Sequence, residues 1–219
     1  MREHIKLEFC KLSDPRYQEI RDRHYVDNRG CHGQQIHFMI HYKDTIAGII
    51  SGGSSVYAVK PRDDFFQIPK DKTKKQKYYL PAIINNTVFR LELHEKNLAT
   101  CVLAKFRKTC QQLWEELYQV HPIGFETFVV EEDWRRGTLY KADNWQYLGQ
   151  TAGSTKTHSG LKNKSQRVET CKKLVFAIKT GKKTPTEPYK SSWRLADPEE
   201  KRRAKRLKQV RNNLIGQMF

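Results

Sequence analysis

The segment formed by residues 82–129 constrains the fold more than any other part of the chain. Residues 82–93 are rich in apolar and β-branched side chains, which predicts a strand. Residues 98–118 predict an amphipathic helix, because apolar side chains recur there at spacings of three and four: Leu103, Phe106, Cys110, Leu113 and Leu117. Apolar residues over 123–129 then predict a second strand. This order predicts an α/β domain in which the helix packs on a sheet.

The segments before residue 82 add both helix and strand. Residues 15–25 predict a short helix, and residues 35–41 with 45–50 predict a hairpin around Lys43-Asp44. Residues 60–79 are rich in Lys and Asp and predict a long surface loop that could grip a substrate. The whole pattern therefore predicts a mixed α/β (α+β) fold.

The stretch after the second strand combines aromatic rings with an amide. Tyr140 leads into Asn144, Trp145 and Tyr147 after a charged turn that ends at Gly137. Amide groups hydrogen-bond to base edges and aromatic rings stack on bases, so this combination suits a flipped or single-stranded base. Trp145 could equally be a core residue.

The motifs GFETFV (124–129) and GTLYKADNWQYLGQTAG (137–153) closely resemble the family of the Druantia anti-phage system protein A, and more distantly the Mom-type DNA adenine modification proteins. The resemblance covers about residues 20–156. Its other landmarks are His24-Tyr25, Gly33-Gln34-Gln35, Arg62-Asp63, Asn85-Asn86 leading to Phe89-Arg90, and residues 97–100. The Mom-type part of the resemblance implies a GNAT-like acetyltransferase fold, with a mixed central sheet flanked by helices, and modification of the exocyclic nitrogen of adenine; the Druantia part implies no particular reaction. The chain departs from the family pattern after the second strand, where Val130 replaces a usual acidic residue and Glu131 follows.

Positive charge is concentrated in the last third of the chain. The formal net charge is +17, and residues 151–219 hold 18 Lys and Arg against 5 Asp and Glu, or +13 of that total. This asymmetry predicts a polyanionic partner, double-stranded DNA with possibly a flipped base, because neutralised phosphates release counterions. A solvated basic tail is the alternative.

The composition changes near residue 155, which predicts two parts. Residues 1–155 would form the GNAT-like domain, and residues 156–219 a basic extension with a short strand at 174–178 and a helix at 197–214. The residues expected to contact nucleic acid are Asn144, Trp145, Lys156, Arg202, Arg203, Lys205 and Arg206.

Membrane, disulfide and metal signals are weak in this sequence. No stretch approaches the ~20 apolar residues of a membrane span, and the N-terminus lacks a signal-peptide core, so we expect a cytoplasmic protein with no membrane partner. Five cysteines without a CxxC pair argue against a disulfide framework and a zinc knuckle. His37 and His41 could share one strand face on a metal or phosphates, but we expect packed side chains and no metal.

Chemistry on an exocyclic amine needs a proton acceptor and an oriented electrophile, because the amine's lone pair is delocalised into the ring. The Mom-type pattern implies Tyr140 as a proton relay, Arg90 as a holder of a donor carboxylate or phosphate, and more loosely Tyr57 as a further tyrosine. Glu126 lies in an apolar strand, so it is either a base with a raised pKa or an ion-pair partner of Arg90. Arg90 could also pair with Glu92.

The loop at residues 94–97 joins a strand to the long helix. In GNAT proteins, to which the resemblance points, such a helix N-terminus binds the pyrophosphate of acyl-CoA. Asn97 or Thr100 would lie there, although either could simply cap the helix, and the usual glycine-rich signature is absent. Acyl-CoA is therefore a possible donor, and another donor could occupy the same place.

Three functions fit these features. The first is a DNA base-modifying transferase that moves an acyl or carbamoylmethyl group to an exocyclic amine, adenine being the first candidate. The second is a non-catalytic DNA-binding or sensing subunit of an anti-phage system, with defence or phage proteins as partners. The third is an RNA- or tRNA-modifying acyltransferase. If Arg90, Glu126, Tyr140 and Asn144 converge on one cleft, the first function gains; if they are buried separately in ion pairs, the second gains.

Overall fold

The computed structural model describes residues 2–25, 33–151, 155–156, 168–169 and 172–181. Its main element is a seven-stranded sheet with the order β1-β2-β3-β4-β5-β9-β6. The strands are β1 (Ile5–Cys10), β2 (Gln35–Tyr42), β3 (Thr45–Ser54), β4 (Ile83–Leu91), β5 (Gly124–Val130), β6 (Gln146–Gln150) and β9 (Lys173–Lys179). Strands β7 (Thr155–Lys156) and β8 (Val168–Glu169) form a separate pair. The expected mixed α/β fold is confirmed.

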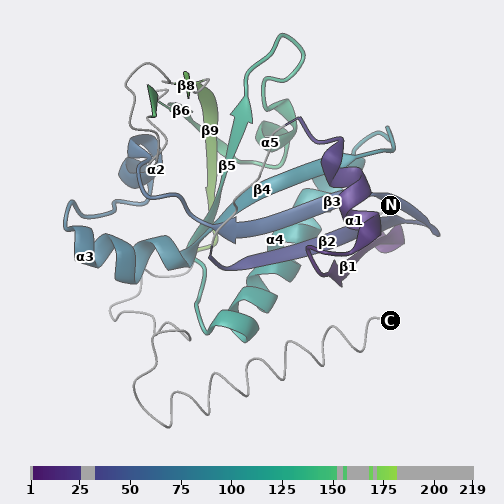
Figure 1. Ribbon diagram of the computed structural model, residues 1–219, viewed down its shortest axis with the longest axis horizontal. Coiled ribbons are helices and arrows are strands. Elements are labelled where there is room, and N and C mark those ends of the chain that lie inside the picture. The colour runs from purple at the N-terminus through teal and green to yellow at the C-terminus, as the bar shows by residue number, and fades with distance from the viewer. Residues whose placement is uncertain (1, 26–32, 152–154, 157–167, 170–171, 182–219) are drawn as a thin grey trace.

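Helices cover both faces of the sheet (Figure 1). Helix α4 (Leu98–Tyr118) carries Phe106, whose ring packs edge-on against Phe38 and Phe125. The opposite face holds α1 (Pro15–Asp22), whose Tyr17 and Ile20 pack with Met39, Ile49 and Val88. The shorter elements are η1 (Arg2–His4), α2 (Lys60–Phe65), α3 (Lys72–Lys74), the π-helical turn η2 (Lys75–Tyr79), η3 (Leu80–Ala82) and α5 (Thr138–Ala142).

The amphipathic helix predicted over 98–118 is α4, with its apolar stripe buried against the sheet. Its close approach depends on Gly52 in β3, because a Cβ there would lie 2.8 Å from the Cys110 sulfur. Residues 60–79 were expected to form a loop but contain α2, α3 and η2. That expectation was wrong because Arg62 and Lys75 turn inward and tie the segment to the sheet.

Strands β4 and β5 are parallel neighbours that separate along their length. They pair only over Ile83–Asn86 with Gly124–Thr127, although β4 continues to Leu91 and β5 to Val130. At the same level β4 bulges, since Ser51 pairs with Val88 whereas Gly52 pairs with Asn86. Figure 1 shows the carboxyl ends of the two strands pointing apart. We refer to the last paired level, Asn86 with Thr127, as the junction.

The strand expected inside the C-terminal extension is β9, which hydrogen-bonds to β5 on one side and β6 on the other. Assigning this strand to a separate extension was therefore wrong, because it is an inner strand of the main sheet. The helix predicted at residues 197–214 lies outside the described residues. Within the described ranges, no helix is both long and apolar enough to cross a membrane.

Candidate active site

Tyr140 places a phenol at the junction. It lies on α5, on the α4 side of the sheet, with 7% of its surface exposed. Its hydroxyl donates to Asn86 Oδ1 over 2.8 Å, and the Thr127 hydroxyl lies 3.4 Å from it. The Thr127 hydroxyl also donates to the Asn86 carbonyl oxygen over 3.0 Å. One polar cluster therefore joins α5, β4 and β5 where the two strands stop pairing.

The local sequence fixes the position of Tyr140. Gly137 precedes α5 with φ +69°, and a Cβ at this position would lie 2.4 Å from the Phe176 ring. The Tyr140 ring stacks on Phe176 with 5.8 Å between centroids, and Trp145 packs against it edge-on at 5.2 Å. These contacts hold the phenol in a single orientation.

Asn86 is equally constrained. Its Nδ2 donates to the carbonyl oxygens of Ser51 at 2.9 Å and Val88 at 3.0 Å, both beside the β4 bulge. The carboxamide oxygen is left facing the Tyr140 hydroxyl. Burial raises the pKa of Tyr140 well above its ordinary value, so the phenol stays protonated.

Glu126 lies on the other face of the same sheet region. Its Oε1 accepts from the Ser55 hydroxyl at 2.6 Å, and its Oε2 accepts from Arg62 Nη1 at 2.9 Å. Both Glu126 and Arg62 are fully buried. Burial raises the pKa of Glu126, and the Arg62 charge opposes that shift. The expectation that Glu126 pairs with Arg90 was wrong, because its carboxylate pairs with Arg62, whereas the direction of its pKa shift agrees with the other expectation.

The Arg62–Glu126 ion pair is part of a larger charged network. The Arg62 Nε donates to Asp63 over 2.7 Å, and Asp63 in turn pairs with Lys75. Tyr57 is 40% exposed, with the Lys75 ammonium 4.6 Å from its ring centroid. Tyr57 therefore lies at the outer end of this network, away from the Tyr140 cluster.

Arg90 is tied to neighbours at the carboxyl end of β4. Its Nε donates to Glu92 over 2.6 Å, and its Nη1 donates to the carbonyl oxygen of Arg23 over 2.6 Å. The side chain is 32% exposed. The alternative of an Arg90–Glu92 ion pair is thus confirmed.

The start of α4 differs from the expected cap. Asn97 occupies the N-cap position with φ 63°, and its side chain makes no cap hydrogen bond. The Thr100 hydroxyl donates to the Asn97 carbonyl oxygen over 3.0 Å. The first backbone N–H groups of α4, at the positive end of the helix dipole, therefore have no side-chain cap. The helix begins a few residues after the end of β4.

The expected base-contacting residues are not gathered in one place. Trp145 is only 3% exposed, donates to Asp143 over 2.9 Å and packs against Phe125, so stacking on a base is not open to it here. Asn144 is exposed with φ 63°. Lys156 belongs to β7, and Arg202, Arg203, Lys205 and Arg206 lie outside the described residues.

Arg90, Glu126, Tyr140 and Asn144 consequently do not meet in one cleft. The sequence reasoning identified Tyr140 and Glu126 but not their partners Asn86, Thr127, Ser55 and Arg62. A signal existed for three of them, since Thr127 lies in the GFETFV motif, and Asn85-Asn86 and Arg62-Asp63 are landmarks of the family resemblance.

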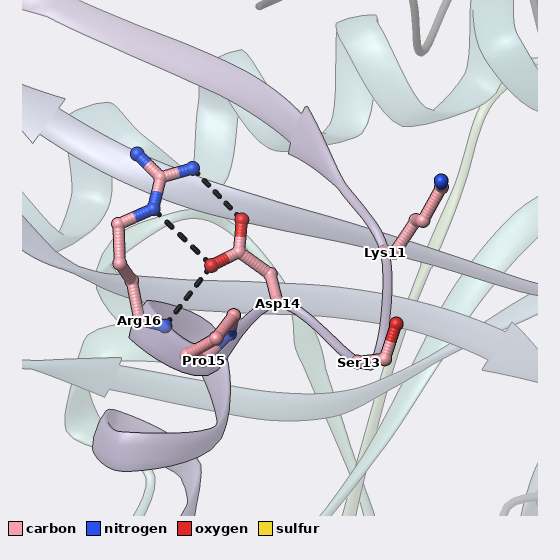
Figure 2. Close-up of a pocket in the computed structure, with 5 residues that line it drawn as sticks. All are labelled: Lys11, Ser13, Asp14, Pro15 and Arg16. Atoms are coloured by element: carbon pink, nitrogen blue, oxygen red, sulfur yellow. Dashed lines mark hydrogen bonds and ion pairs between the residues drawn. The ribbon is translucent and has the colours of Figure 1, made fainter.

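A surface pocket of about 420 Å³ lies elsewhere, at the start of α1 (Figure 2). Its polar groups satisfy one another: Asp14 accepts from the Arg16 backbone at 3.0 Å and from its guanidinium at 2.8 Å, and Arg16 also reaches Glu8. The Arg16 hydrogen bond lowers the pKa of Asp14. This arrangement is a helix cap with a salt bridge.

Comparison with solved structures shows a GNAT acetyltransferase-like fold. An acetyltransferase of Bacillus subtilis in complex with CoA is 7% identical, with a TM-score of 0.51 over 80% of this chain and 98% of that chain. A GNAT family acetyltransferase from Elizabethkingia anophelis with acetyl-CoA bound is 8% identical, with a TM-score of 0.48 over 81% and 99%. A search of curated proteins returned no match.

The family model of the Druantia protein DruA matches residues 5–187. The match includes the strands β4 and β5, the Tyr140 cluster and the Arg62–Glu126 pair. It spans well over half of the sequence and agrees with the motifs around residues 124–153. The chain therefore belongs to the Druantia protein DruA family.

Proposed function

We propose that this protein is an acyl-CoA-dependent transferase that acylates an exocyclic amino group of a DNA base in anti-phage defence. The observation that carries the proposal is the buried, protonated Tyr140 hydroxyl at the junction, 2.8 Å from Asn86 Oδ1. The GNAT-like fold and the DruA family support it.

The residues present fit an acyl-CoA donor in two respects. The α4 N-terminus, without a side-chain cap, offers backbone N–H groups and a positive dipole end to a pyrophosphate. Beyond the junction, β4 and β5 no longer hydrogen-bond to each other. Their facing backbone groups are therefore available to the amides of an extended donor arm. When bound, acyl-CoA would supply a thioester that an amine can attack.

The role of Tyr140 follows from its protonation. Transfer forms a nitrogen–carbon bond, breaks the carbon–sulfur bond, removes one proton from the amine and adds one to the sulfur. Tyr140 would donate this proton, because its hydroxyl is the protonated group held at the junction by Asn86. Asn86 orients the hydroxyl, and the proton lost by the amine restores the phenol during turnover.

DNA as the substrate rests on charge. The net charge of +17 favours a polyanion, and the family's link to phage defence favours DNA over RNA. Adenine is the first candidate only because of the resemblance to the Mom-type proteins.

A non-catalytic DNA-binding subunit is the second candidate. It is favoured by the ion pairing of Arg90 with Glu92 and of Glu126 with Arg62, which leaves neither side chain free for catalysis. In this case Tyr140 and Asn86 would be structural.

Nucleoside analysis separates the two candidates. The full chain is expressed in bacteria, the cellular DNA is digested, and nucleoside masses are compared with Tyr140→Phe and with Tyr147→Phe, a change to a half-exposed tyrosine. We expect a new nucleoside with the wild type and Tyr147→Phe, reduced at least about 100-fold with Tyr140→Phe.

The mass shift would name the transferred group. An unchanged nucleoside profile, together with purified protein that binds DNA but neither acetyl-CoA nor CoA, would reject the transferase and support the binding subunit.

A further inference from the structure

Two consecutive asparagines occupy the end of the β4–β5 pairing. Neighbouring residues of a strand point to opposite faces. Ile84 lies under α4, since its Cγ2 is 2.9 Å from the Cβ position of Gly52 beside Cys110. Asn85 is therefore on the opposite face, where its register partners are Gly53 and Glu126. Asn86 holds Tyr140 on one side, and Asn85 belongs to the other.

Asn85 has a polar atom without a partner. The residue is only 7% exposed, and its Oδ1 is the one side-chain nitrogen or oxygen of the described residues that is buried without a hydrogen bond. A buried acceptor without a donor is unfavourable, and natural proteins retain few of them. Such an atom in a native protein calls for an explanation, such as a ligand that donates to it.

The side chains around Glu126, the cross-strand partner of Asn85, are engaged elsewhere. Gly53 has no side chain. The Ser55 hydroxyl and the Arg62 guanidinium are already directed at Glu126, at 2.6 and 2.9 Å. The Glu126 carboxylate is itself an acceptor. Within the described residues Asn85 Oδ1 accepts no hydrogen bond, so it is available to a donor on a ligand.

We infer that Asn85 binds the exocyclic amino group of the base to be modified. The inference rests on the proposed function and names the acceptor side of that site. A carboxamide oxygen accepts from an amino group while its nitrogen donates to the adjacent ring nitrogen, the pairing by which Asn recognises adenine. The base then approaches from the Glu126 face.

This placement gives each asparagine its own part of the reaction. Asn85 orients the amine from one face of the junction, and Asn86 orients the proton-donating Tyr140 from the other. The amine would thus be held apart from the proton donor, so that it could add to the carbonyl face of the acyl group while Tyr140 protonates the departing sulfur. Asn85 acts as a substrate-binding residue.

The test compares bases with and without the amino group. Binding of the full chain to a short single-stranded oligothymidylate is measured with one central adenine or one central purine, which lacks the amine. The wild type should bind the adenine strand about 10- to 100-fold more tightly. Asn85→Leu should bind both strands equally, and the control Gln112→Leu, which removes an exposed carboxamide from α4, should keep the preference.

Thermal unfolding distinguishes substrate binding from a structural role. Because Asn85→Leu removes an unpaired acceptor, its Tm should equal or exceed that of the wild type. A lowered Tm together with an unchanged base preference would mean that Asn85 serves the fold, and would overturn the inference.

A second pair of oligothymidylates tests another amino base. One carries a central cytosine, and the other carries a central 2-pyrimidinone, which lacks the amine. A preference for cytosine that Asn85→Leu removes would support the amine contact and assign it to cytosine. Equal wild-type binding within both pairs would overturn the inference, yet acetyl transfer to DNA could still be observed and would keep the proposed function. Failure of acetyl-CoA binding would reject that function while leaving the base preference measurable.

Discussion

The two faces of the β4–β5 junction bury different kinds of polar group, neutral on one face and charged on the other. On the α4 face, Tyr140, Asn86 and Thr127 form a neutral cluster with no formal charge. On the α2 face, Glu126 and Arg62 form a fully buried ion pair that extends to Asp63 and Lys75. Glu126 and Thr127 are consecutive residues of β5, yet they belong to different arrangements, because side chains alternate between the faces of a strand.

The difference bears on which face can do chemistry. The ion pair uses both carboxylate oxygens of Glu126 and anchors α2 to the sheet, so its charges are committed to structure. The neutral cluster holds one dissociable proton, on Tyr140, in a fixed direction at the junction. We therefore place the proton donor on the α4 face, whereas on the α2 face the ion pair is a rigid support and Asn85 is the group proposed to meet the base.

Loss of Arg62 should have the largest effect. Arg62→Met leaves Glu126 buried without a counterion and should lower the free energy of unfolding by about 3–5 kcal/mol in chemical denaturation. Lys60→Met removes an exposed ion pair with Asp64 from the same helix and should cost no more than about 1 kcal/mol. Equal effects of the two changes would mean that the buried pair is not the anchor.

The same variant should acquire a distinctive pH dependence. Burial raises the pKa of Glu126, and without Arg62 it should rise further. An acid whose folded pKa is raised stabilises the fold below its ordinary value near 4.5, and that stability is lost as the pH rises through the folded pKa.

Arg62→Met should therefore regain part of its lost stability at pH 5 relative to pH 8, measured by denaturation against wild type. Adding Glu126→Gln should abolish this pH dependence. A pH-independent deficit would show that Glu126 does not titrate in the folded variant.

Tyr140→Phe probes the neutral face. It leaves Asn86 Oδ1 buried without its donor, so the free energy of unfolding should fall by about 1–3 kcal/mol. Tyr147→Phe, on a side chain that is 44% exposed, should change it by less than about 0.5 kcal/mol. If Tyr140→Phe is as stable as wild type, the cluster is looser than its geometry indicates.

Thr127→Val should have the smallest effect. It removes the hydrogen bond to the Asn86 carbonyl oxygen with little change in shape, which should cost about 1 kcal/mol in the same denaturation assay. A loss as large as that of Arg62→Met would indicate that the neutral cluster, and not the ion pair, holds the junction together.

Periodicity was sufficient to predict the strand, helix and strand over residues 82–129, because apolar spacing reports directly which side chains a helix or strand buries. It failed for residues 60–79, where hydrophilic composition suggested a loop. The inward turn of Arg62 and Lys75 depends on Glu126 and Asp63, and no local pattern encodes such partners.

The candidate site shows the same division. Tyr140 and Glu126 could be named from motif and burial arguments. For Trp145, the sequence could not decide between stacking on a base and packing in the core, and its packing on Phe125 shows the core role. The pairing of Arg90 with Glu92 was one of two open alternatives, and only the geometry chose between them.

The sequence by itself therefore determined the elements over residues 82–129, their apolar faces and the family, because these depend on spacing and motifs along the chain. The tertiary structure decided which polar groups meet: Arg62 with Glu126 across 64 positions, Tyr140 with Asn86 across 54, and Asn85 Oδ1 with no group of the described residues. Such meetings depend on strand register and on where parallel pairing stops, and both are set by packing between segments far apart in the chain.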